Sequence, residues 1–128
     1  MGLALAAILA ESAARHPERT ALVFSGERTS YRELWEQARR YAGVLRARGA
    51  RPGDRIAILM PNLPDFARAY YAILALGCVV VPVHALLTAE EVEYVLRDSG
   101  ARTLLCAGAL LAAGLPAARA AGVECLSV

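Results

Sequence analysis

The sequence predicts an α/β fold in which an N-terminal hairpin and helix precede βαβ units that form a mostly parallel sheet with helices on both faces. Short apolar runs alternate with helical patterns at intervals of roughly 20 to 25 residues, as in a chain of such units. Gly or Pro stands at nearly every transition. The length of 128 residues corresponds to one domain, with a candidate sub-boundary at the turn near residues 50–54.

A helix and a hairpin are expected at the start of the chain. Residues 3–14 have a helix-forming composition, and Pro17 ends this helix because the residue before a proline avoids helical backbone angles. Residues 20–25 are typical of a strand, Gly26 and Glu27 of a tight turn, and residues 28–31 of the returning strand.

A second helix is predicted from Ser30 to the stop at Gly49. Ser30 is followed three positions later by Glu33, which is the pattern of a reciprocal capping box. An ion pair between Glu36 and Arg40 is expected on the wet side of this helix. Its buried stripe is predicted to comprise Leu34, Ala38, Tyr41, Ala42 and Leu45.

Two strands flank a third predicted helix. Residues 55–60 form the first strand, after which Asn62 is a plausible helix cap and Pro64 suits the first helical turn. Residues 78–83 are apolar on both faces, which predicts a strand in the interior of the sheet. The buried stripe between them is predicted to be Phe66, Ala69, Tyr70, Ile73 and Leu74.

The last third of the chain predicts two more helices and two more strands. Thr88 and Glu91 form a second capping box before a helix that ends at Gly100. A strand over 103–106, a helical stretch broken at Pro116 and a strand over 123–128 follow. Because the last element is a strand with no closing helix, the chain is expected to be an incomplete part of a larger fold.

The charge pattern excludes several functional classes. The net charge is +2, all fourteen basic residues are Arg, and they are scattered rather than gathered in a stripe, so a nucleic-acid interface is not expected. The absence of Lys excludes a Schiff base and a Walker-type phosphate loop. No Gly-x-Gly-x-x-Gly fingerprint follows any predicted strand.

The cysteines and the apolar segments indicate a cytoplasmic protein without a membrane span. Cys78, Cys106 and Cys125 lie too far apart in sequence for a zinc motif, and an odd number gives no closed disulfide framework. Residues 69–89 are uncharged, but Gly77 and Pro82 divide them into a helix and a strand.

His84 is the one candidate for a substrate-binding residue. It follows the strand over 78–83, at the carboxyl edge where open α/β sheets place ligands. A loop histidine bonded to backbone explains the same position and is the simpler interpretation. No catalytic residue and no metal site is predicted.

Several ordered motifs resemble the N-terminal portion of adenylate-forming (AMP-binding) enzymes, the superfamily of acyl-CoA synthetases, luciferases and peptide-synthetase adenylation domains. They are residues 20–24 and 29–34, the stretch from Pro52 to Asn62, residues 74–82 leading to 86–88, and residues 98–102. The resemblance runs in order from about Leu5 to Leu105 and is closest to acyl-CoA synthetases, or fatty-acid–CoA ligases.

The resemblance implies a two-step reaction in the full-length parent. A carboxylic acid and ATP give an acyl-adenylate, and CoA then displaces AMP to give a thioester. The family's phosphate loop, Mg²⁺-associated Glu and catalytic Lys match no position here, so ATP, Mg²⁺ and CoA are expected in the parent and no cofactor in this chain.

Two functional hypotheses follow. The first is an N-terminal fragment of an acyl-CoA synthetase that is inactive alone and whose partner is the remainder of the parent. The second is a standalone binding or regulatory module with the same partial fold. In the resembled family later segments complete the hairpin and the sheet, so the apolar faces and sheet edges left open here predict a homo-oligomer.

Overall fold

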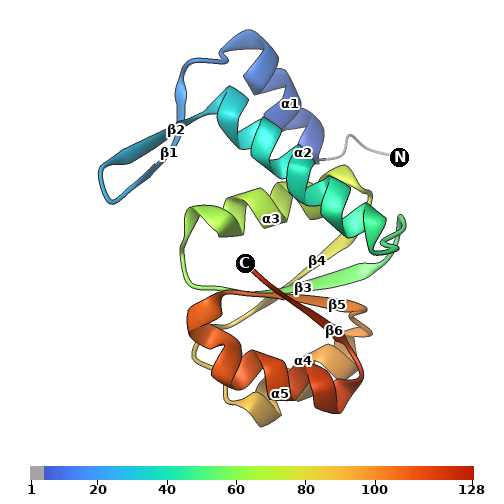
Figure 1. Cartoon of the computed structure of the whole chain (residues 1–128). Coiled ribbons are helices and arrows are strands. Elements are labelled where there is room, and N and C mark those ends of the chain that lie inside the picture. Colours follow the sequence, from blue (N-terminus) through green and yellow to red (C-terminus); the bar gives the residue numbers. More distant parts are fainter. Residues whose placement is uncertain (1–4) are drawn as a thin grey trace. The chain divides into compact units, whose positions relative to one another are not determined.

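The computed structural model describes residues 5–128, and these divide into two units (Figure 1). The first unit contains the chain up to Pro52 together with Leu63–Cys78. The second contains Gly53–Asn62 and Val79–Val128. The predicted helix over 3–14 is observed as α1 (Leu5–Arg15), and the first two residues of that prediction lie outside the described part.

Three helices and a hairpin make up the first unit. Helix α2 (Tyr31–Ala47) contacts both α1 and α3 (Pro64–Ala75), and α1 also contacts α3. The hairpin consists of β1 (Thr20–Phe24) and β2 (Glu27–Ser30). The buried apolar side chains of these helices are Ala6, Leu9, Ala13, Leu34, Ala38, Ala42, Leu45, Ala69, Ala72 and Ile73.

The hairpin turns one residue earlier than predicted. Its central residues are Ser25 and Gly26, with φ of 50° and 81°, whereas the sequence predicted Gly26 and Glu27. Two consecutive residues with positive φ match the right-handed twist of the flanking strands. Glu27 therefore pairs with Phe24 as the first residue of β2.

The capping box at the start of α2 is confirmed. The Ser30 N–H donates to Glu33 Oε1 at 2.9 Å, and the Glu33 N–H donates to Ser30 Oγ at 3.1 Å. The hydrogen bond from the Ser30 backbone lowers the pKa of Glu33 below its usual value. Within residues 5–128, the Glu36–Arg40 ion pair that the sequence suggested is absent, and both residues are exposed.

The start of α3 differs from its prediction. Leu63, not Asn62, is the N-cap residue, and no side chain caps this end of the helix. Pro64 occupies the first turn as expected, where its missing N–H leaves one donor fewer to satisfy. Of the predicted stripe, Ala69 and Ile73 are buried, whereas Phe66, Tyr70 and Leu74 are half-buried.

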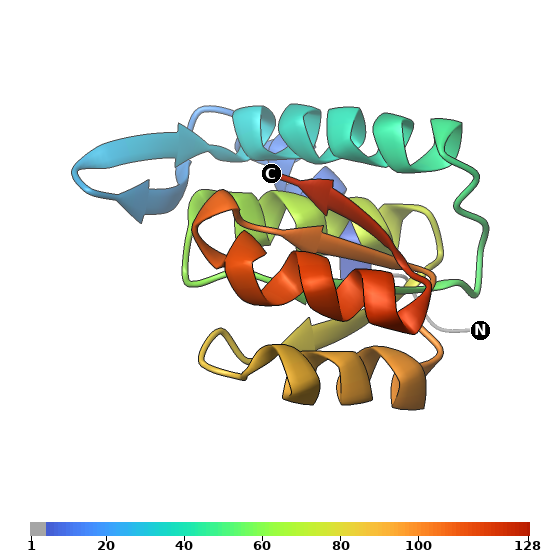
Figure 2. The same ribbon diagram turned by 60° about the horizontal axis from the view of Figure 1, so that its bottom comes forward.

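The second unit is a four-stranded parallel sheet with two helices on one face. Strands β3 (Arg55–Leu59), β4 (Val79–Val83), β5 (Thr103–Cys106) and β6 (Glu124–Ser127) lie in the order β4-β3-β5-β6. Helices α4 (Ala89–Ser99) and α5 (Leu111–Ala121) run side by side (Figure 2). A short 3₁₀ turn, η1 (Gly108–Leu110), precedes α5.

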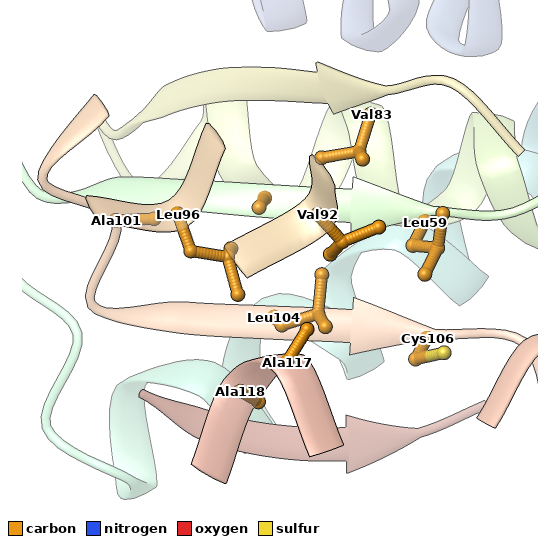
Figure 3. Close-up of a cluster of buried hydrophobic side chains, with 10 residues drawn as sticks. Leu59, Val83, Val92, Leu96, Ala101, Leu104, Cys106, Ala117 and Ala118 are labelled. Atoms are coloured by element: carbon orange, nitrogen blue, oxygen red, sulfur yellow. The ribbon is translucent and has the colours of Figure 1, made fainter. Parts of the chain in front are cut away.

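Alternate residues of the strands form the core beneath these helices (Figure 3). Strand side chains alternate between faces, so residues two apart point the same way. The core comprises Ala57, Leu59, Val83, Leu104 and Cys106 from the strands, Val92, Leu96, Ala117 and Ala118 from the helices, and Ala101. The predicted α/β class, with a hairpin, a helix and a parallel sheet, is confirmed.

Strand β4 is an edge strand, and the prediction that it lies inside the sheet is wrong. Among the described residues it pairs only with β3, and Val79 at its start is 47% exposed. Pro82 fits this position, because a proline within a sheet is tolerated where no neighbour needs its N–H.

Helix α5 continues through Pro116, although the sequence predicted a break there. A proline cannot donate to the carbonyl four residues earlier, here that of Ala112. Both Ala112 and Pro116 are exposed, so water can reach that carbonyl. The opposite side of the helix, with Gly114, Ala117 and Ala118, is buried and holds the helix in place.

We expect Gly114→Ala to destabilise the chain by about 1–3 kcal/mol. A Cβ at Gly114 would lie 2.6 Å from Cys106 Sγ and 3.2 Å from Leu59 Cδ2, and both of those side chains are fully buried. Gly43 in α2 is the matched control, since a Cβ there meets nothing within 4 Å. Gly43→Ala should therefore stabilise the chain by up to about 1 kcal/mol through helix propensity.

Urea unfolding of both variants measures this difference. Adding Cys106→Ala to Gly114→Ala removes the clashing sulfur and should recover part of the loss. Equal midpoints for the two glycine variants would contradict the close approach of α5 to β5.

Candidate functional site

The carboxyl ends of the four parallel strands form one row at a single edge of the sheet. Leu59 pairs with Val83 on one side and with Cys106 on the other, and Cys106 pairs with Ser127. Figure 3 shows the strands pointing the same way, with Leu59, Val83 and Cys106 near their ends. The loops that open from this row are the part of such a sheet where ligands bind.

The centre of the row, between β3 and β5, is apolar and closed by backbone hydrogen bonds. The chain leaves β3 toward β4 and leaves β5 toward β6, so the direction of winding reverses at this point. The Ala107 N–H donates to the Leu59 carbonyl at 3.0 Å, and Met60 and Ala107 are buried. These residues can form the wall of a site but carry no acid, base or nucleophile.

His84 is the polar side chain that follows directly on this row. Its Nδ1 accepts a hydrogen bond from the Leu86 N–H at 3.1 Å, and its carbonyl accepts from the Leu87 N–H at 3.2 Å. Because Nδ1 acts as an acceptor, the ring proton lies on Nε2. The imidazole is exposed, so it offers one N–H donor at the carboxyl edge of the sheet.

The thiols close to this row are unreactive. Burial, with a smaller effect of the neighbouring Cys125, raises the pKa of Cys106 to about 11. Burial also raises the pKa of Cys125. Both side chains are therefore thiols at neutral pH, and the thiol is a poor nucleophile and a poor metal ligand.

A half-buried polar network in the first unit was not predicted from the sequence. The Tyr41 hydroxyl donates to Asp65 Oδ1 at 2.5 Å, Arg68 Nη1 donates to the same oxygen at 3.0 Å, and Arg68 Nε donates to Gln37 Oε1 at 2.7 Å. The four side chains join α2 to α3. Only their spacing within each helix, four residues for Gln37 and Tyr41 and three for Asp65 and Arg68, could have pointed to it.

The described part of the chain offers no ligand set for a metal and no membrane-spanning helix. Across residues 5–128, no three His, Cys, Asp or Glu side chains are grouped so that they could hold an ion. None of the helices in the same range has both the length and the apolar character needed to cross a bilayer.

Comparison with known protein families, curated proteins and solved structures finds similarity to AMP-binding enzymes and CoA ligases. A family model described as AMP-binding enzyme matches residues 9–127. A long-chain-fatty-acid–CoA ligase of Bacillus subtilis is 39% identical over 95 residues, which cover 74% of this chain and 17% of the ligase. The chain therefore spans about a sixth of the length of this relative.

Solved structures that include a CoA ligase superpose closely on this chain. The benzoate CoA ligase of Burkholderia xenovorans matches with a TM-score of 0.92 and 31% identity over 99% of this chain and 26% of that one. The N-terminal domain of FACL13 from Mycobacterium tuberculosis matches with a TM-score of 0.90 and 30% identity over 99% and 34% of the two chains.

We expect Tyr41 to ionise at a higher pH than an ordinary tyrosine. Burial, together with the hydrogen bond to Asp65, raises the pKa of Tyr41 from 10.0 to about 12. The folded state thus favours the protonated phenol, so this contribution to stability is complete below pH 10 and is lost as the pH rises through 12. In a pH titration, absorbance at the tyrosinate band should show a component that appears only near pH 12, here called the late component.

Tyr41→Phe should remove that late component, whereas Tyr94→Phe, at a side chain that is 67% exposed, should leave it in place. A late component that survives in Tyr41→Phe would contradict the assignment.

Proposed function

This chain belongs to the AMP-binding enzyme family, and on that premise we propose that it forms the N-terminal part of an ATP-dependent acyl-CoA synthetase. In the first step of the proposed reaction, a carboxylate oxygen attacks the α-phosphorus of ATP, which gives an acyl-adenylate and pyrophosphate. In the second, the CoA sulfur attacks the acyl carbon and AMP leaves. The observation that supports this choice is the 39% identity to a long-chain-fatty-acid–CoA ligase across 74% of the chain.

We assign the binding of ATP, Mg²⁺ and CoA to the remainder of the parent protein, which is the partner that this proposal requires. The sequence has no Lys to meet a phosphate, and residues 5–128 hold no group of three metal-ligating side chains. Residues 5–128 thus offer no ligand set for the Mg²⁺ of Mg²⁺–ATP. We also propose that the protein acts in the cytoplasm, in keeping with three free cysteines, and that it self-associates.

His84 is proposed to contact the carboxylic acid substrate. Its support is geometric: the residue follows β4 at the carboxyl edge of the sheet, and the hydrogen bond from Leu86 leaves Nε2–H free to donate. One N–H donor suits a carboxylate or carbonyl oxygen. Acid–base catalysis is not assigned to it, because its second nitrogen is engaged by the backbone.

We expect the chain alone to bind no Mg²⁺–ATP at micromolar concentrations. The sequence contains no lysine, and residues 5–128 hold no ligand set for the metal of the metal–phosphate group. Isothermal titration calorimetry checks this, with the chain combined with the remainder of its parent as the positive control. A micromolar dissociation constant for the chain alone would show that the phosphate site lies within it.

Combining the two parts should restore chemistry that neither has alone. Co-expression of this chain with the remainder of its parent should give a complex with carboxylate-dependent exchange of pyrophosphate into ATP. A complex that exchanges pyrophosphate with no fatty, aryl or short-chain acid would refute the synthetase and favour a binding module.

In the same complex, His84→Ala should change the KM for different carboxylic acids by several-fold or more and leave the KM for ATP within about twofold. His16→Ala, which alters the other histidine of the chain in the turn after α1, is the control and should change neither. An equal effect of His84→Ala on ATP and on every acid would mean that the residue shapes the fold rather than the acid site.

A further inference from the structure

The outer face of α2 carries arginines that no carboxylate of the described chain neutralises. Arg39, Gly43 and Arg46, here called the α2 ridge, lie at positions i, i+4 and i+7 and are all exposed. Within residues 5–128, Arg39 and Arg46 make no ion pair and no side-chain hydrogen bond, whereas Arg15 and Arg32 in the same unit pair with Glu11 and Glu18.

Nothing in the surroundings of Gly43, at the centre of this ridge, requires a glycine at that position. A glycine inside a helix costs about 1 kcal/mol relative to alanine. A Cβ at Gly43 would meet nothing within 4 Å, and its backbone does not adopt a positive φ. The missing side chain leaves a notch between two arginines, where another molecule can approach the helix closely.

The outer face of α4 has the complementary pattern. Glu90, Tyr94 and Asp98, here called the α4 ridge, lie at i, i+4 and i+8 and are exposed, with Tyr94 at 67%. Over residues 5–128, neither Glu90 nor Asp98 makes an ion pair, and the arginine of this helix, Arg97, pairs with Glu93. An aromatic side chain therefore projects between two uncompensated carboxylates.

The net charges of the two units have the same signs as the ridges that they carry: positive for the unit with α2 and negative for the unit with α4. The first unit contains ten arginines and six carboxylates, and the second contains four arginines and six carboxylates. A surface with an excess of positive charge and one with an excess of negative charge attract each other when they belong to separate molecules.

We propose that the α2 ridge of one copy of this chain docks on the α4 ridge of a second copy. Tyr94 fills the notch at Gly43, and Glu90 and Asp98 meet the two arginines. The charged residues span about 10 Å along α2 and about 12 Å along α4, so both pairs can form at once. An arginine beside the Tyr94 ring adds a cation–π contact.

The contact is weak, salt-sensitive and independent of the proposed synthetase chemistry. Two helix faces bury less surface than a stable dimer requires, so association needs high protein concentration. Exposed ion pairs are screened by salt, so the contact weakens as ionic strength rises. Because two different surfaces meet, each chain can use its α2 ridge and its α4 ridge with different neighbours.

Sedimentation velocity of the full chain over a concentration series tests the proposal. At about 50 mM salt the mass should rise above that of one 13.6 kDa chain as concentration increases, and at about 1 M salt it should return to one chain. A chain that stays monomeric at millimolar concentration and low salt would overturn the contact.

Substitutions then locate the surface. Gly43→Gln fills the notch and Tyr94→Ala removes the side chain that occupies it, so each should lower the association constant at least tenfold. Gly43→Gln also raises helix propensity, so its unfolding midpoint should not fall. Arg39→Gln should weaken association several-fold, whereas Arg119→Gln on α5, with the same change in charge, should leave it unchanged.

An equimolar mixture of Gly43→Gln and Tyr94→Ala gives the sharpest result. The first variant keeps an intact α4 ridge and the second keeps an intact α2 ridge, so the mixture should form heterodimers that neither variant forms alone. Association that persists in both single variants, or a mixture that stays monomeric, would place any self-association on another surface and refute the proposal.

Discussion

Parallel strand order is the constraint on which the second unit depends. Parallel neighbours cannot be joined by a tight turn, so the chain must cross back over the sheet after each strand. Helices α4 and α5 provide two of these crossings and bury the same face of the sheet. The same order collects every strand end at one edge, which is why His84 lies beside the row formed by Val83, Leu59 and Cys106.

Close packing on that face determines which residues are tolerated in α5. Gly114, Ala117 and Ala118 present almost no side chain toward the sheet, so the helix can lie against Cys106 and Leu59. Burial on this side keeps α5 helical through Pro116 despite one missing backbone hydrogen bond. It also holds the Cys106 thiol in its protonated form, so packing and chemical inertness have the same cause.

The described residues offer few groups that could take part in a reaction at the carboxyl edge of the sheet. The described residues provide an apolar wall at the centre of the strand row, one histidine N–H beside it and no ligand set for a metal. In the first unit, the polar atoms of Tyr41, Asp65 and Arg68 bond to one another and so join two helices. These observations support the proposal that the remainder of the parent carries out the phosphate chemistry.

The sequence by itself determined the features that depend on neighbours within three or four residues. Both capping boxes, at Ser30 with Glu33 and at Thr88 with Glu91, formed as predicted, and the second of these helices ends at Gly100 as predicted. The order of motifs was also enough to indicate the family. Such features are local because a side chain bonds to backbone atoms of its own turn, and no distant residue is needed.

Only the tertiary structure decided the rest. The edge position of β4, the unbroken α5 and the bond between Tyr41 and Asp65, which lie 24 residues apart, each depend on partners that are distant in sequence. The apolar run of β4 was consistent with either an interior or an edge strand, and Pro116 with either a break or a continuous helix. Burial and pairing energies chose between them, and those energies exist only once distant segments have met.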